Sequence, residues 1–291
     1  MPVAEAVAYG AASVVNAIST GKGAALGVDL WTRAEVKLTQ NAGNVTANIR
    51  SEPGEATDLV TAVVRKVLER YGRSRRFGAH VETRSNIPIA RGMKSSSAAA
   101  NAVALATTAA LGEKIRDREV LEDSVEGALE AGVTVTGAFD DASASYYGGL
   151  VVTDNKRRRI LRRERVPNYC VLFHIPPRKS YTAKANILEF RKLAQIAELA
   201  HGLALGRHYW EALTLNGLAH SVVLGWEPKV AIAAMSGGAV AAGLSGKGPA
   251  TVAIVKKHRA SDVRRAMSMF EGRIVEARIN NRKARVIASD S

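Results

Sequence analysis

The sequence predicts an α+β fold in two lobes, with residues 1–165 forming the first lobe and residues 166–291 the second. Two observations support this prediction. Strand-like alternation and helix-like periodicity are mixed in the first half of the chain, and a second set of strands and helices follows Pro167. A length of 291 residues, with 47% apolar and 23% charged side chains, is typical of a globular chain that can build one bilobal unit.

Three strands and two helices are expected in the first part of this lobe, and an apolar stripe at residues 120–129 predicts a further helix that ends at Gly132. Residues 27–38, 44–50 and 79–84 alternate apolar and polar side chains, as half-buried strands do. Residues 57–71 and 95–111 have the periodicity or composition of helices. The first lobe is therefore expected to be mixed α+β.

The second lobe is expected to start with a strand at residues 169–175 and to follow the element order of a ferredoxin-like lobe. Its other predicted elements are helices at 183–201 and 207–224, two strands flanking Gly246, a helix at 261–270 and a strand at 273–278.

The charge balance is strongly basic, with 41 Lys and Arg against 27 Asp and Glu and a formal net charge of +14. Such a charge favours anionic ligands. The basic residues gather at 156–165 and 273–285, which makes a nucleic-acid-binding protein an alternative interpretation. These runs contain no aromatic side chain on which a base could stack, so we predict no nucleic-acid partner.

The single cysteine and the hydropathy of the chain indicate in which compartment the protein resides. The single cysteine cannot form an internal disulfide, which fits a reducing environment. No signal segment is visible, and the apolar stretches are too short to span a membrane. We expect a cytoplasmic protein with no membrane partner, and we leave open whether it forms a homodimer.

Residues 88–100, P-I-A-R-G-M-K-S-S-S-A-A-A, predict a phosphate-binding loop that opens into a helix. The first N–H groups of a helix have no partner within it, and the helix dipole places partial positive charge there, so a di- or triphosphate is a natural ligand. We expect Ser95, Ser96 or Ser97 to cap this helix and Lys94 to add a full charge. An ordinary capped helix in a core is the alternative.

This segment resembles the P-x-x-x-G-L-G-S-S-A-A motif of the GHMP kinase superfamily, whereas the Walker-type phosphate loop is absent. Lys94 and Ser97 stand where the superfamily usually has glycine and alanine. The resemblance implies the two-lobed GHMP kinase fold, with a first lobe like domain 2 of ribosomal protein S5 and a ferredoxin-like second lobe. It also implies that ATP is bound by the loop residues Pro88, Ile89, Ala90, Arg91, Gly92, Met93, Lys94, Ser95, Ser96 and Ser97.

Two adjacent acids, Asp140 and Asp141, follow a glycine in a stretch of small residues that we expect to be a loop. Adjacent carboxylates repel each other, so a bound cation or a proton to be removed would explain them; a solvated acidic turn is the alternative. In the superfamily a catalytic aspartate lies seven residues before a glycine pair, which implies Asp141, with Asp140 as the substitute candidate. The superfamily also has a magnesium-binding glutamate eleven residues before the catalytic aspartate, and Glu130 stands at that position. The resemblance implies that Glu130 and Ser96 bind Mg²⁺ together. A solvent-facing glutamate is the alternative.

Two further segments extend the resemblance. Residues 241–255 resemble the C-terminal motif of the superfamily, although a tight hairpin would have a similar sequence, and residues 12–30 resemble archaeal-type shikimate kinases. The resemblance implies an ATP- and Mg²⁺-dependent kinase that phosphorylates the 3-hydroxyl of shikimate, with Lys22 or Lys94 balancing the developing charge. A homoserine or mevalonate kinase is the alternative. The implied acceptor contacts are Asn16, Lys22, Asp141, Arg178, Ser245 and Gly246.

Overall fold

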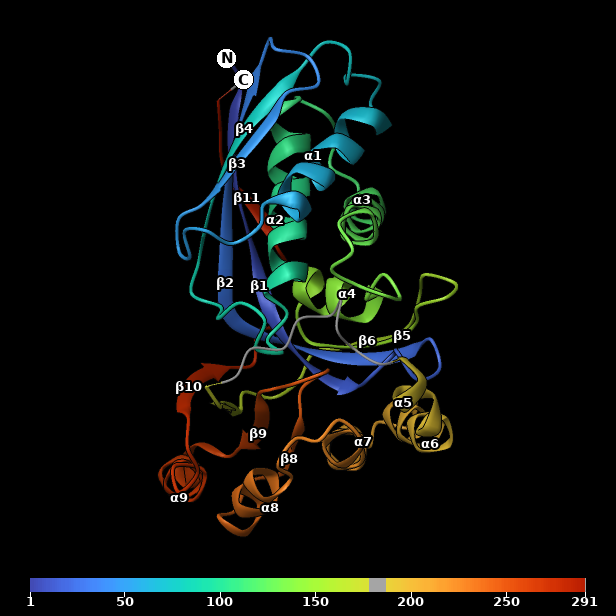
Figure 1. Cartoon of the computed structure of the whole chain (residues 1–291), viewed down its shortest axis with the longest axis vertical. Coiled ribbons are helices and arrows are strands. Elements are labelled where there is room, and N and C mark those ends of the chain that lie inside the picture. Colours follow the sequence, from blue (N-terminus) through green and yellow to red (C-terminus); the bar gives the residue numbers. More distant parts are fainter. Residues whose placement is uncertain (178–186, 291) are drawn as a thin grey trace.

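The computed structural model describes residues 1–177 and 187–290, which form two lobes arranged along the long axis of the molecule (Figure 1). The first lobe contains a sheet of seven strands and the second a sheet of four, counted over the described residues. The fold is the two-lobed α+β architecture that the sequence predicted.

The sheet of the first lobe has the strand order β11-β1-β2-β4-β3, and β5 pairs with both β2 and β6. Helices α1 to α3 lie together on one side of this sheet, where the apolar stripe of α1 and the alanine-rich α2 meet it (Figure 1). The elements are β1 (Val3–Val15), β2 (Lys22–Thr39), β3 (Val45–Ile49), α1 (Asp58–Arg70), β4 (Gly78–Ser85), α2 (Ser95–Ala110), α3 (Asp117–Glu130), α4 (Phe139–Tyr147), β5 (Leu150–Asp154), β6 (Arg159–Glu164) and β11 (Arg285–Asp290).

The second lobe is ferredoxin-like, as predicted. Its strands are all antiparallel in the order β10-β7-β9-β8, so the first and third strands of the lobe lie at the centre of the sheet. The elements are β7 (Cys170–Ile175), α5 (Ile187–Lys192), α6 (Ala194–Leu205), α7 (Tyr209–Val223), α8 (Lys229–Ser236), β8 (Ala241–Leu244), β9 (Thr251–Val255), α9 (Ala260–Met267) and β10 (Arg273–Arg278).

Strands β1 and β2 belong to both lobes. Their outer halves, including Ala4 and Val36, are buried in the core under α1 to α3, whereas Val14 and Leu26 near the other end are buried in the core that reaches β7 and α7. These two strands therefore tie the cores together and bring the end of β1 to the junction between the lobes.

The structure differs from the prediction in several places. Strands β1 and β11 were not expected as strands, α8 was not expected as a helix, and Asp140 and Asp141 lie in the helix α4 where a loop was expected. Strand β11 pairs with β1 in the first lobe, so the end of the chain departs from the predicted second lobe of residues 166–291. Both ends of the chain consequently lie together at the far end of the first lobe (Figure 1).

Candidate active site

A cleft of about 410 Å³ opens at the junction of the lobes and extends along the first lobe. Three segments distant in sequence line it: the turn after β1 that contains Asn16, the loop and start of α2 from Ile89 to Ser97, and the 246–248 loop between β8 and β9. The start of α4, with Asp141, lines the same space. The cleft therefore includes the segments that the sequence motifs singled out, together with residues of β2 to β4, α1, α3 and the 131–138 segment.

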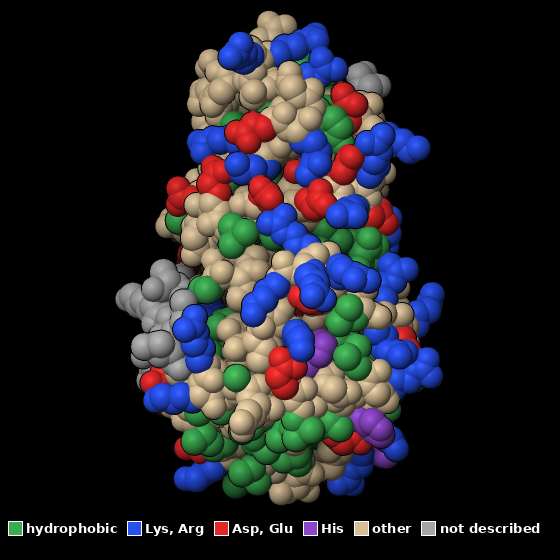
Figure 2. Space-filling model, turned by 90° about the vertical axis from the view of Figure 1, so that its right-hand side faces the viewer, with side chains coloured by type: hydrophobic (Ala, Val, Ile, Leu, Met, Phe, Trp, Pro, Cys, Tyr) green, Lys and Arg blue, Asp and Glu red, His purple; other side chains and the backbone are tan. Residues whose placement is uncertain are grey.

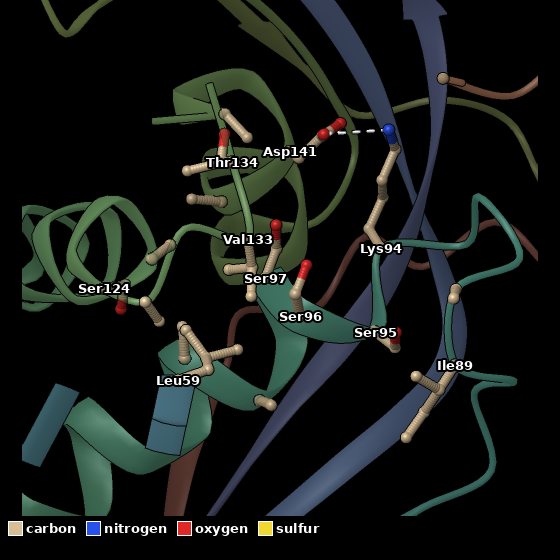
Figure 3. A pocket seen from close by; sticks show the side chains of 18 of the residues that line it. Leu59, Ile89, Lys94, Ser95, Ser96, Ser97, Ser124, Val133, Thr134 and Asp141 are labelled. Atoms are coloured by element: carbon tan, nitrogen blue, oxygen red, sulfur yellow. Dashed lines mark ion pairs between the residues drawn. The ribbon is translucent and has the colours of Figure 1, made fainter. Parts of the chain in front are cut away.

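The phosphate loop enters α2 through Lys94, which has a φ of 62° and a ψ of 37°, in the left-handed region. No side chain caps the helix, so the expectation that Ser95, Ser96 or Ser97 is the cap is wrong. The reason is that helical geometry already begins at Ser95, which leaves the three serines on the first turn, where Ser96 and Ser97 lie next to the cleft (Figure 3). Serine hydroxyls that do not cap the helix remain available to a ligand at its positive end.

Lys94 points across the cleft to the start of α4 (Figure 3). Its Nζ lies 2.9 Å from Oδ2 of Asp141, and both side chains are nearly buried. The second oxygen of this carboxylate, Oδ1, is buried and has no hydrogen-bond partner among the described residues. A buried anionic oxygen without a partner carries a large desolvation cost, so this atom is suited to accept a proton or a hydrogen bond from a bound ligand.

Asp140 occupies a different environment from its neighbour. Its Oδ1 accepts a hydrogen bond of 2.8 Å from Asn155 Nδ2, and the whole residue is buried beside β2. Burial, and then the adjacent carboxylate of Asp141, raise the pKa of Asp140. Both acids line the cleft, but their surroundings differ: Asp140 is held in a buried network with Asn155, whereas Asp141 is paired with Lys94.

The loop between β8 and β9 is fixed against the phosphate loop and against β1. Ser245 Oγ donates a hydrogen bond of 2.7 Å to the carbonyl of Gly92 and accepts one of 3.1 Å from Ser13 N–H. Asn16 Nδ2 donates a bond of 3.0 Å to the carbonyl of Gly246. Gly246 has a φ of 64°, a conformation that favours glycine, and a Cβ there would lie 2.6 Å from Lys94 Nζ and displace the end of that side chain.

These contacts correct several predicted roles. Ser245 was predicted to contact the acceptor, but its side chain is fully buried and joins two loops. Lys22 pairs with Glu198 at 2.8 Å and does not line the cleft, because its position at the start of β2 directs it toward α6. Arg178 lies outside the described residues. Asn16 and Gly246 do line the cleft.

Glu130 is also away from its predicted place. It ends α3 and pairs with Lys66 of α1 at 2.7 Å, with 42% of its side chain exposed, and it does not line the cleft. The spacing of eleven residues along the chain did not bring its carboxylate beside Asp141, since the end of α3 and the 131–138 segment separate them. Its ion pair with Lys66 offsets the unfavourable position of a carboxylate at a helix C-terminus.

Not every residue of the phosphate loop faces the cleft. Arg91 donates hydrogen bonds to the carbonyls of Pro176 and Pro177, at 2.7 and 2.8 Å, and thereby joins the loop to the end of β7. Met93 is fully buried in the core shared by the lobes. Along with Pro88, these residues are not part of the cleft lining. The residues of this loop and of the start of α2 that do line the cleft are Ile89, Ala90, Gly92, Lys94, Ser95, Ser96 and Ser97.

Several residues of the cleft were not identified from the sequence, and Lys247 is one of them. Lys247 lines the cleft beside Gly246, and burial, followed by the proximity of Lys94, lowers its pKa to about 7. Its place in the sequence could have indicated this role, because Lys247 stands between two glycines in the turn of residues 245–249.

The chain is similar to proteins of known activity. Residues 58–149 match the family described as GHMP kinases N terminal domain. The chain is 41% identical to the shikimate kinase of Methanosarcina mazei over 278 residues, which cover 95% of this chain and 94% of the relative. It is 44% identical to the shikimate kinase of Methanothrix thermoacetophila, with 98% of this chain and 96% of the relative covered. The chain belongs to the GHMP kinases, in the group of archaeal shikimate kinases.

The fold agrees with this family. The crystal structure of homoserine kinase from Cytophaga hutchinsonii superposes with a TM-score of 0.73 at 18% identity, covering 98% of this chain and 97% of that one. As a GHMP kinase, the chain is a phosphotransferase that uses ATP. Within residues 1–177 and 187–290 no helix is long and apolar enough to cross a membrane.

The donor atoms of the cleft suit a hard cation. Ser96 offers a hydroxyl at the start of α2, and the carboxylates of Asp140 and Asp141 line the same cleft. Among the described residues, no group of three or more His, Cys, Asp or Glu side chains could hold a metal alone. Magnesium in kinases is usually held by one or two protein oxygens together with substrate phosphates, so the residues present fit a metal that arrives with the nucleotide.

Proposed function

We propose that this GHMP kinase transfers the γ-phosphoryl group of Mg-ATP to the 3-hydroxyl of shikimate and releases 3-phosphoshikimate and ADP. The observation that carries the proposal is the partnerless, buried Oδ1 of Asp141, held by Lys94 at the end of a phosphate loop in a shared cleft. The identity to archaeal shikimate kinases supports the choice of acceptor. The enzyme would act in the cytoplasm on small molecules.

Phosphoryl transfer requires alignment of the reacting groups and neutralisation of charge more than covalent chemistry by the protein. The phosphates of ATP would lie at the start of α2, against the first-turn N–H groups and the hydroxyls of Ser95, Ser96 and Ser97. Lys94 would neutralise negative charge that develops on the transferred group. These roles follow from the positions of the side chains around one cleft.

Asp141 would receive the proton of the acceptor hydroxyl on Oδ1 while that oxygen attacks the γ-phosphorus and ADP leaves. Lys94 would hold the carboxylate through Oδ2 and keep it in place during the reaction. Asp140 would remain in its network with Asn155 and orient the first turn of α4. Asp140 also lines the cleft, but its hydrogen bond with Asn155 makes it a weaker candidate than Asp141 for direct contact with the acceptor.

Magnesium would be held by Ser96 and by the phosphates, near Asp141, and would supply charge neutralisation on the outer phosphates. Glu130 is left out of this site because its carboxylate is paired with Lys66. Asn16 and Gly246, on the side of the cleft facing the second lobe, would contact the acceptor.

The decisive experiment is an acceptor panel with the purified chain, in which ADP release and the phosphorylated product are measured with shikimate, homoserine and mevalonate. We expect shikimate to give a kcat/KM at least 100-fold above the other two, and removal of Mg²⁺ to abolish ADP release. Comparable or higher activity with homoserine or mevalonate would reject shikimate as the acceptor while leaving the kinase assignment in place.

A further inference from the structure

The position of Asp141 depends on a short helix that has little support of its own. Helix α4 has nine residues and follows Ala138, whose φ of 47° lies in the left-handed region. The residue at its N-terminus provides no side-chain cap. A helix this short is only marginally stable by itself, so contacts with other elements determine where its first turn lies.

Asn101 of α2 provides one of these contacts. Its Nδ2 donates a hydrogen bond of 2.9 Å to the carbonyl of Ala142, the residue after Asp141, and both partners are buried. Because a carbonyl oxygen can only accept, the amide nitrogen of Asn101 must be the group that faces α4. Within the described residues, the other polar contact between the start of α2 and α4 is the ion pair of Lys94 with Asp141.

An asparagine is costly at this place in the fold. Asn101 is fully buried in α2, a helix that consists largely of alanine, and asparagine has a lower helix propensity than alanine. Its Oδ1 has no hydrogen-bond partner among the described residues. A buried amide with one group unpaired lowers stability relative to an apolar side chain. Stability of the core therefore does not account for Asn101.

The hydrogen bond joins the parts of the two helices that would serve the reaction. Ser97 and Asn101 are four residues apart, so they lie one turn from each other on the same face of α2. Asp141 and Ala142 are neighbours at the start of α4, and both line the cleft together with Ser97. The bond therefore constrains the distance between the helix turn proposed to hold the phosphates and the carboxylate proposed to accept the proton.

We propose that Asn101 is a positioning residue for phosphoryl transfer, which holds the first turn of α4 so that Asp141 stays aligned with the phosphates at the start of α2. Asn101 does not line the cleft, so it acts through α4 and touches neither substrate. This inference rests on the proposed function, because it takes Asp141 as the group that receives the acceptor proton.

The first test removes the hydrogen bond. Asn101→Ala should lower kcat for shikimate about 10- to 100-fold, the loss expected when a reacting group is displaced by about 1 Å. KM for shikimate and the Kd of ATP, measured by calorimetry, should stay within about threefold, because no group that binds either ligand is removed.

Thr107→Val is the matched control in the same helix. Thr107 is fully buried, and its hydroxyl donates a hydrogen bond of 2.7 Å to the carbonyl of Val103 within α2. The substitution therefore removes a buried polar group of α2 without touching α4. It should leave kcat within about twofold of the wild-type value.

The decisive measurement is a double-mutant cycle with Asp141→Asn. If Asn101 acts by placing the carboxylate of Asp141, its loss has little left to change once that carboxylate is gone. Asn101→Ala should then lower kcat less than about threefold in the Asp141→Asn background, against about 10- to 100-fold in the wild type. A purely structural role of Asn101 would give similar losses in both backgrounds.

A second variant keeps the test valid if Asn101→Ala does not fold. In Asn101→Ser the side chain is too short to reach α4, and its hydroxyl can bond to the carbonyl of Ser97 within its own helix. This variant should lose kcat to the same extent as Asn101→Ala. Melting curves followed by circular dichroism show which variants are folded at the temperature of the assay.

Three results would overturn the proposal. Near-normal kcat in a folded Asn101→Ala or Asn101→Ser would show that the hydrogen bond is not needed, and losses that add in the cycle would show that it does not act through Asp141. A rise in KM for shikimate or in the Kd of ATP with unchanged kcat would assign Asn101 to ligand binding.

Failure of the proposed function looks different. A wild-type enzyme inactive on shikimate would reject the acceptor, and the cycle would then be measured with the acceptor that the panel selects. Near-normal kcat in Asp141→Asn alone would reject the role of Asp141 and, with it, the positioning role of Asn101.

Discussion

Lys94 has a backbone conformation in which glycine is the favoured residue, and this explains the glycine usual at this place in the GHMP motif. The conformation of the loop is kept in this chain at a cost of about 1 kcal/mol for a residue with a Cβ in the left-handed region. In return the loop carries an ammonium group to Asp141. The departure from the motif is thus a gain of charge in the cleft.

This interpretation predicts that two variants of Lys94 lose activity alike but differ in stability. Lys94→Gly removes the charge and the backbone strain, whereas Lys94→Met removes the charge alone. We expect both variants to lose about 10- to 1000-fold in kcat, because each lacks the cation that neutralises the transferred group. Lys94→Gly should nevertheless be more stable than Lys94→Met by about 1 kcal/mol in urea unfolding. Equal stability of the two variants would contradict the strain.

A second prediction concerns Asp141. Asp141→Asn keeps the shape of the side chain but cannot receive the acceptor proton, so kcat should fall about 100- to 10,000-fold. The affinity for ATP, measured by calorimetry, should stay within a few fold because this side chain faces the acceptor. Asp140→Asn is the matched comparison, since it alters the neighbouring carboxylate inside the Asn155 network. Near-normal kcat in Asp141→Asn would remove it from the mechanism.

At the scale of elements, helix α7 lies unusually close to strand β8. A Cβ on Gly217 of α7 would be 2.5 Å from the Cα of Gly243 and 2.6 Å from the backbone nitrogen of Leu244. The strand it would displace leads directly into the 246–248 loop. A pair of glycines therefore sets the distance between the helix and the sheet that carries one wall of the cleft.

Gly217→Ala should lower the free energy of unfolding by about 1–3 kcal/mol, because backbone atoms must move apart to admit the methyl group. Gly202→Ala in the neighbouring α6 is the control, since a Cβ there has no atom within 4 Å. That change should raise stability by up to about 1 kcal/mol through helix propensity. Chemical denaturation of both variants measures the difference, and destabilisation of similar size in the two would contradict close packing as the cause.

Many of the helices and strands could be predicted from the sequence, whereas some strands and side-chain partners could not. Helices α1 and α2 carry strong apolar or alanine patterns, and the glycine-rich motifs mark the loops that meet in the cleft. Strand β1 was missed because it is buried along most of its length and so has no alternation to detect. Glu130, Lys22 and Ser245 were misplaced because their partners, Lys66, Glu198 and Gly92, lie far away in sequence. Pair contacts of this kind depend on tertiary packing.

At the scale of the whole molecule, the positive charge is distributed over the surface. Figure 2 shows Lys and Arg interspersed with Asp and Glu over the upper part of the visible face. Several basic residues have acidic partners, among them Arg70 with Asp123 at 2.9 Å and Arg158 with Glu126 at 2.8 Å. Such ion pairs weaken the electrostatic potential of the surface at a distance. Small anions should therefore bind more selectively to the cationic groups inside the cleft.

The shared strands predict cooperative unfolding of the two lobes. Because β1 and β2 contribute to both cores, loss of one core should disrupt the other. Circular dichroism and tryptophan fluorescence, from Trp31 in the first lobe and Trp210 and Trp226 in the second, should therefore report the same transition. Mg-ATP at about 100 times its Kd should raise the free energy of unfolding by about 2.7 kcal/mol. Two separate transitions would show that the strands do not couple the lobes.

Strand β11 also has a consequence for association between copies of the chain. It covers one edge of β1, with Val3 opposite Asp290. Without β11, the backbone N–H and C=O groups of β1 would be exposed along that edge and could pair with a strand of another molecule. Loss of β11 should therefore promote aggregation, although none of its residues lines the cleft.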